Sequence, residues 1–247
     1  MTVAGGDALR DEAEAFAQRL SDTVSGFVGK PCPFRADVFE TGRFSVAEEG
    51  EGIQLTVGGV AMLSLEVNYQ CEWNSSNTYM AVHSSRVAVH AGGRPKGNPL
   101  FRYEYERGLG HDLPSAHLQV HAHRDAFAHV MSTAGRKAHS GQARDTLALG
   151  SIPELSTFHF PLGGHRFRPC LEDLLASLKA EFGLDAAADW REALAAGRLQ
   201  WRRQQLAAAV SDCPEEAARA LESLGYVVTR AEGKPPPRER VDRMTAL

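Results

Sequence analysis

Three histidines recur in one short segment, at a spacing that would place their side chains together. Side chains of a β-strand alternate between its two faces, so residues two or four positions apart share a face. His117, His121 and His123 would then lie on one face, while Leu118 and Val120 would lie on the other. The apolar face can pack on a core. The segment therefore predicts a histidine-rich site on the polar face of a sheet.

This group of histidines could act in three ways, and the sequence leaves all three open. Imidazole nitrogens bind transition metals, so His117, His121 and His123 could be ligands of a metal ion. Without a metal, His121 and His123 could exchange protons with a substrate, together with His159 from a second short strand. The simplest alternative is that the imidazoles are exposed on a solvent-facing surface of the sheet.

A second candidate site follows a Gly-Gly pair and precedes a predicted helix. It consists of His165, Arg166 and Arg168, and the first turn of the helix carries Glu172 and Asp173. Guanidinium groups and the backbone N–H groups of a helix N-terminus both favour anions. We therefore predict an anion site at this segment, with a nucleic-acid phosphate as the anion. In the structural alternative, Glu172 and Asp173 form ion pairs with both arginines.

Together the two segments could cleave RNA without a metal ion or another cofactor. His121, His123 and His159 are the predicted catalytic residues, with one imidazole acting as a base and another as an acid. The arginines would stabilise the charge that develops on the phosphate. We therefore predict a toxin-like RNA-processing protein. The alternatives are a non-catalytic protein that binds a partner, such as a defence or toxin–antitoxin accessory subunit, and a metal-dependent hydrolase.

The elements that must position these residues follow from the hydrophobic period of the chain. Segments 61–73 and 100–106 alternate apolar and polar residues, which is typical of antiparallel strands with one polar face. A β-bulge is expected near 84–85. Apolar residues at helical spacing predict helices over 7–25 and 169–182. We expect an α+β fold, with an antiparallel sheet of five to seven strands covered by helices, plus a C-terminal helical appendix.

The chain becomes rich in Ala and Arg after Gly183, and three short helices are predicted there. They span 188–195, 197–210 and 214–224. The second of these helices carries Arg198, Trp201 and Arg202, and we interpret it as solvent-facing. The predicted division of the chain is a sheet domain over 1–183, a helical appendix over 184–230 and a disordered tail over 231–247.

Composition restricts the partners and the cellular compartment. The formal net charge is −4, which argues against broad electrostatic binding of nucleic acid and leaves room for a local basic patch. The four cysteines form no C-x-x-C pair, so they indicate neither a zinc finger nor a disulfide framework. The N-terminus has no apolar run of the signal-peptide type, and no stretch has the length and apolar character of a membrane span. We expect a cytoplasmic protein without membrane contact.

The order of motifs along the chain is an aromatic strand over Phe101–Tyr105, a histidine-rich strand, a short strand with His159, and a Leu-rich helix. This order resembles the TumE-like group of toxin–antitoxin proteins, and the resemblance covers about residues 60–182. It implies a small antiparallel α+β fold, an activity directed at nucleic acid, and a protein partner such as an antitoxin. The segment 158–201 is also similar to uncharacterised proteins of high-GC bacteria, which implies no function.

Overall fold

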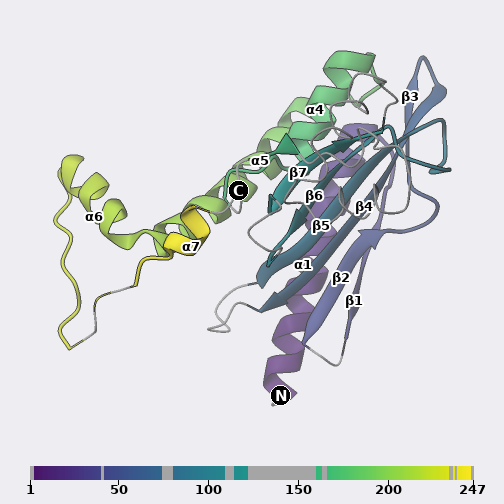
Figure 1. Ribbon diagram of the computed structural model, residues 1–247. Helices are drawn as coiled ribbons and strands as arrows, with labels where there is room; N and C mark the ends of the chain where they lie inside the picture. The colour runs from purple at the N-terminus through teal and green to yellow at the C-terminus, as the bar shows by residue number, and fades with distance from the viewer. Residues whose placement is uncertain are drawn as a thin grey trace, which may run out of the picture.

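The computed structural model describes residues 3–39, 42–73, 80–108, 114–121, 160–162, 166–233, 236 and 238–245. The fold is α+β, as predicted, with an antiparallel sheet covered by helices (Figure 1). The helices in this part of the chain are α1 (Val3–Val28), α4 (Leu171–Phe182), α5 (Trp190–Asp212), α6 (Pro214–Ser223) and α7 (Val241–Met244). The strands are β1 (Phe34–Val38), β2 (Arg43–Glu48), β3 (Ile53–Val57), β4 (Val60–Trp73), β5 (Met80–Ala91), β6 (Phe101–Glu106), β7 (Ala116–Val120) and β8 (Phe160–Pro161).

Neighbouring strands are antiparallel throughout the described sheet. The strand order is β1-β2-β4-β5-β6-β7-β8, and β3 pairs with the first half of β4. The long strands β4 and β5 form its centre. Their register shifts because Gln70 pairs with Ser84 while Cys71 pairs with Val82. This shift leaves His83 as the extra residue of a β-bulge, next to the position that the sequence predicts.

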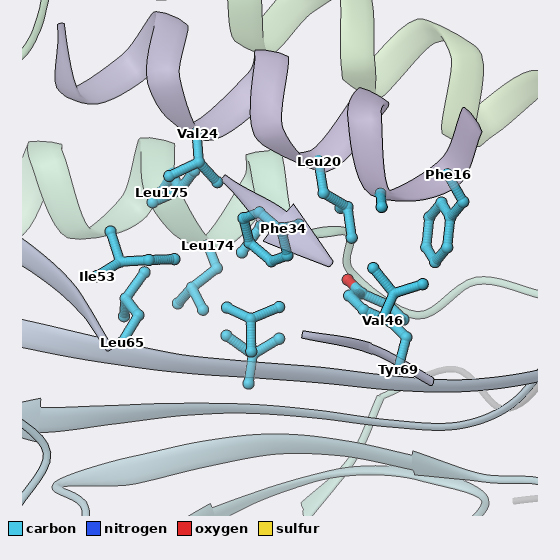
Figure 2. Close-up of a cluster of buried hydrophobic side chains, with 14 of the residues drawn as sticks. Phe16, Leu20, Val24, Phe34, Val46, Ile53, Leu65, Tyr69, Leu174 and Leu175 are labelled. Carbon is cyan, nitrogen blue, oxygen red and sulfur yellow. The ribbon is translucent and has the colours of Figure 1, made fainter. Parts of the chain in front are cut away.

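Helices α1, α4 and α5 cover one face of this sheet (Figure 1). The apolar stripe of α1 and the leucines of α4 pack on the apolar positions of the strands (Figure 2). The contributing side chains include Phe16, Leu20 and Val24 of α1, Leu174 and Leu175 of α4, and Ile53, Leu65 and Tyr69 of the sheet. Burial of each large apolar side chain stabilises the fold by about 1.5–3 kcal/mol, so this layer supplies the main core.

Helix α4 confirms the predicted helix closely, although it begins after Pro169. Cys170 is its N-cap residue, and Gly183 ends it with a left-handed φ of 65°. The Gly183 N–H donates to the Lys179 carbonyl oxygen at 3.0 Å. A residue with a Cβ atom would be strained in this conformation, which explains a glycine at the helix end.

Helix α5 is a single helix, where the sequence predicts two short ones that break near Gly197. The glycine does not end the helix, because its role is close packing. A Cβ atom at Gly197 would collide with the Glu172 carboxylate and would lie 2.9 Å from Thr23 Oγ1 of α1. The glycine therefore leaves room for the Glu172 and Thr23 side chains where α5 lies against α4 and α1.

The segment between α4 and α5 is fixed to the sheet. Leu184 and Leu194 are fully buried in the main core, so the start of the predicted appendix (184–230) packs with the sheet domain. The Asp185 carboxylate accepts hydrogen bonds from the N–H groups of Gly58 and Gly59 at 3.0 and 2.8 Å. These contacts hold the end of α4 against the β3–β4 turn.

Beyond α5 the chain leaves the sheet. Helix α6 lies away from the sheet and has no buried residue (Figure 1). The predicted disordered tail includes α7, which returns to the end of α5, where the Arg240 N–H donates to the Asp212 carbonyl oxygen at 2.8 Å. None of the helices in the described ranges has the length and apolar character needed to cross a membrane.

Candidate anion-binding pocket

A cavity of about 400 Å³ opens on the helix-covered side of the sheet, between α1, the strand ends and α5. Arg19 of α1 and Arg107, just after β6, line it together with Arg166 and Arg168 from the segment before α4. Glu12 is the lining residue with a carboxylate among those described. The predicted arginines 166 and 168 therefore lie in a common pocket with two further arginines. We call this cavity the arginine pocket.

Arg168 is held in the pocket by aromatic rings. Its guanidinium carbon lies 3.7 Å from the centre of the Tyr105 ring and 5.0 Å from that of Trp201. Burial lowers the pKa of Arg168 to about 10, and the negative charges that Tyr105 and Tyr69 can carry oppose this shift. The side chain therefore remains a cation at neutral pH. Both rings lie within cation–π distance of the guanidinium, whose charge is kept in a low-dielectric setting.

Arg166 has a carboxylate partner that the sequence does not suggest. Its Nε donates to Asp212 Oδ2 at 2.6 Å, and Asp212 is only 3% exposed at the end of α5. Arg243 of α7 reaches the other carboxylate oxygen at 3.1 Å. Arg166 therefore pairs with Asp212 and not, as the structural alternative expected, with Glu172 or Asp173. Asp173 accepts instead from Arg198 at 2.7 Å.

The two remaining arginines are held more loosely. Arg107 lies 3.7 Å from a Glu72 oxygen, an ion pair with both side chains partly exposed. Arg19 lies 5.5 Å from the centre of the Phe16 ring, and burial lowers its pKa while the charge of Glu12 raises it. The Arg107–Glu72 pair is longer than a hydrogen bond, and Arg19 contacts an aromatic ring. The pocket therefore carries more positive than negative charge on its wall.

The rest of the pocket is apolar and aromatic. Trp73 and Met80 are paired across β4 and β5 and line the cavity, and Trp201 of α5 lines it too. Gln205 also lines the pocket, and its amide oxygen is buried without a hydrogen-bond partner in the described structure. Further cavities of about 360 and 410 Å³ adjoin Trp201. A ligand here would meet cations, ring faces and an unsatisfied amide.

The described histidines lie on the other face of the sheet. His117 pairs with Glu104 across β6 and β7, whereas its neighbour Ala116 pairs with Tyr105, the ring beneath Arg168. Adjacent strand residues point to opposite faces, so His117 points away from the arginine pocket. His121 lies on the same face as His117, since its N–H donates to the Leu100 carbonyl at 2.9 Å and extends the register.

His117 is part of a buried polar network and is not exposed, contrary to the simplest prediction. The residue is only 4% exposed. Its Nδ1 lies 2.9 Å from the Pro114 carbonyl oxygen, and its Nε2 lies 3.3 Å from Glu104 Oε2. Arg102 Nε lies 3.0 Å from the other oxygen of Glu104. Burial raises the pKa of Glu104, but the His117 hydrogen bond and the Arg102 charge outweigh it and lower the pKa overall.

Several polar side chains near this network are buried, although Arg86 on the same face is exposed. Ser64, His90 and Gln119 all point to it and are at most 3% exposed. The strand alternation therefore places these side chains on the predicted face, but they are buried and not exposed to solvent. His90 Nε2 lies 2.9 Å from Glu66 Oε2, so this histidine also has a carboxylate partner.

Three predicted site residues lie outside the described residues, namely His123, His159 and His165. The structure consequently tests neither the catalytic group of His121, His123 and His159 nor the metal group of His117, His121 and His123. Within the described ranges, no group of three or more His, Cys, Asp or Glu side chains could hold a metal ion.

Only two of the four arginines that line the arginine pocket, Arg166 and Arg168, were predicted from the sequence. Arg19, Arg107 and Trp73 come from three elements far apart in the chain, and no local motif links them. Trp201 carried a usable signal, because a large aromatic residue beside arginines on a helix is unusual for a purely solvent-facing surface.

Comparisons of the chain with models of known families, with curated proteins and with solved structures found no match.

Proposed function

We propose that this protein binds single-stranded RNA through the arginine pocket, as part of a toxin-like RNA-processing activity. The observation that carries the proposal is the convergence of four arginines and four aromatic rings on one cavity. Arginine suits phosphate because its planar fork donates two parallel hydrogen bonds. Aromatic rings stack on the bases of single strands, which are unpaired and accessible. The combination favours single-stranded RNA over a duplex.

Binding and cleavage are separate parts of this proposal. Cleavage needs groups that exchange protons beside the bound phosphate. No imidazole occurs among the described residues that line the pocket, and His117 points to the opposite face. Of the predicted catalytic residues His121, His123 and His159, His159 is the closest to Arg166 in sequence, and it stays the predicted proton-transfer residue at this pocket. Changing His159 to Ala should abolish RNA cleavage while leaving RNA binding within about two-fold.

The binding proposal is tested by fluorescence anisotropy with a labelled single-stranded RNA of mixed sequence. The variants are Arg107→Ala and Arg166→Ala, which each remove one cation from the pocket wall. Both should weaken binding, and each lost phosphate contact should make the slope of log K against log salt shallower by about 0.7. Circular dichroism and a thermal melt confirm that each variant is folded.

Arg203→Ala is the matched control, because Arg203 is exposed on α5 and does not line the pocket. It removes the same charge from the same region of the chain. An equal loss of affinity in this control would show that general charge, and not the pocket, determines binding. The proposal also fails if the unaltered protein has no affinity for RNA at low salt.

A non-catalytic partner-binding role is the second candidate, and the C-terminal part of the chain favours it. Leu224, Tyr226 and Val227 follow α6 and are 74%, 64% and 89% exposed. Clustered exposed apolar residues often mark a protein interface. Co-expression with the product of the adjacent gene tests this role. A stable complex that is lost in Tyr226→Lys, with unchanged RNA binding, would support it.

A further inference from the structure

We infer that the arginine pocket holds a single nucleotide, with its phosphate on the arginines and its base against the indoles of Trp73 and Trp201. The inference rests on the proposed RNA binding at this site and names the unit that the pocket recognises. It predicts that free nucleoside monophosphates bind without the rest of an RNA strand.

The size of the pocket supports a ligand of this kind. Its volume of about 400 Å³ falls within the range of about 300–1,000 Å³ that small-molecule sites have. A bare phosphate would leave most of this space unfilled. The apolar lining needs a partner as well, because Met80, Val82 and Ala208 offer no polar group to an anion.

The aromatic residues divide into two pairs by exposure. Phe16 and Tyr105 are 7% and 3% exposed, so their rings belong mainly to the core. Trp73 and Trp201 are partly exposed and line the same cavity. Large, accessible indole faces are the groups on which a base stacks, and such stacking is tolerant of base identity. The pocket therefore offers a stacking surface as well as a charged one.

The amide of Gln205 supplies the third recognition element. Its oxygen is buried and has no hydrogen-bond partner in the described structure, and the side chain lines the pocket. An unsatisfied buried acceptor is costly, so a ligand that donates a hydrogen bond to it gains affinity. A base amino group or a ribose hydroxyl is such a donor. A fatty acid would satisfy the arginines and the apolar wall but not this amide.

The test is isothermal titration calorimetry of the full chain with the four nucleoside 5′-monophosphates. Ribose 5-phosphate, which has the anion without the base, and adenosine, which has the base without the anion, are the comparison ligands. At least one nucleotide should bind about ten-fold or more tightly than either comparison ligand, since stacking alone changes affinity by roughly 5- to 150-fold. Binding should also quench tryptophan fluorescence.

Gln205→Leu probes the amide without removing a charge or much volume. It should weaken nucleotide binding by roughly two- to ten-fold, and the variant should unfold at the same or a higher temperature because a buried unpaired oxygen is gone. Gln18→Leu, at an exposed position of α1, is the matched control and should leave nucleotide binding unchanged. A structural role for Gln205 would instead lower the melting temperature.

The outcomes separate this inference from the proposed function. Equal affinity for ribose 5-phosphate and the nucleotides, or unchanged affinity in Gln205→Leu, overturns the nucleotide site. If RNA binding depends on Arg107 and Arg166 while the mononucleotides do not bind, the RNA proposal stands and the inference is wrong. If the mononucleotides bind and RNA does not, the nucleotide site stands and the RNA proposal is wrong.

Discussion

The two faces of the sheet both carry charged side chains, but they arrange them differently. On the face opposite the helices, the Glu104 carboxylate lies between His117 at 3.3 Å and Arg102 at 3.0 Å. On the helix-covered face, Arg107 and Arg166 line a cavity of about 400 Å³. The first arrangement is closed by its own ion pairs, whereas the second leaves room beside its cations.

This difference indicates how each face contributes. The partly buried Glu104 carboxylate is shared by His117, Arg102 and Arg86 and contributes to folding, because its removal takes away the acceptor that joins these side chains. Arg107, whose pair with Glu72 is long and partly exposed, contributes little to stability and can interact with a ligand, whereas Arg166 lines the same cavity and is also held by Asp212. Substitutions on the two faces should therefore separate stability from RNA affinity.

The largest expected effect comes from Glu104→Leu on the network face. It leaves His117 and Arg102 without their shared carboxylate, and we expect the free energy of unfolding to fall by about 3–4 kcal/mol. Urea unfolding followed by circular dichroism measures this loss. Glu106→Leu, at an exposed position of the same strand, is the control and should change stability by less than about 0.5 kcal/mol. A similar, small loss in both variants would contradict the network.

Asp212→Asn should act on stability and binding in opposite directions. The Asp212 carboxylate is 4% exposed and accepts from Arg166 and Arg243, so loss of its charge should cost about 2–3 kcal/mol. The change also releases Arg166 from its ion pair, and RNA affinity in the folded variant should rise roughly three-fold. Unfolding curves and anisotropy measure the two effects. Weaker RNA binding would show that Asp212 positions Arg166 for the ligand.

Much of the fold could be predicted from local sequence patterns. The alternation in β4 and β6, the apolar stripe of α1 and the glycine that ends α4 predicted the α+β class and the helix-covered sheet correctly. These features depend on neighbours in sequence, which a pattern captures. The break predicted near Gly197 was wrong, because this glycine lies inside a continuous helix against the side chains of Glu172 and Thr23, contacts that no local pattern shows.

The candidate site could be predicted only in part, for the same reason. Arg166 and Arg168 stand in one segment and could be identified from composition. The burial of His117 depends on the pairing of β6 with β7, and the Arg166–Asp212 ion pair joins residues 46 positions apart. Which side chains face a cavity depends on the packing of distant elements, so Arg19, Arg107 and Trp73 could not be placed there.

Acid should affect the network face through Glu104. Its folded-state pKa lies below the ordinary 4.5, so its stabilising contribution is complete above that pH and is lost as the pH falls through the folded value. Asp173 also has a lowered pKa and contributes in the same direction. Unfolding of the unaltered protein and of Glu104→Gln should therefore be compared between about pH 6 and pH 3. The variant should lose less stability on acidification, and equal losses would show that Glu104 is not responsible.

Arg107→Ala is expected to have the smallest effect on stability and gives the clearest contrast with Glu104. The pair of Arg107 with Glu72 is long, at 3.7 Å, and both side chains are partly exposed. Such pairs contribute at most about 1 kcal/mol, so the free energy of unfolding should change by less than about 0.5 kcal/mol. RNA affinity should nevertheless fall, because the cavity wall loses a cation that a phosphate can reach. A stability loss as large as that of Glu104→Leu would mean that the arginines of the pocket hold the fold together, and the distinction between a closed face and an open one would no longer hold.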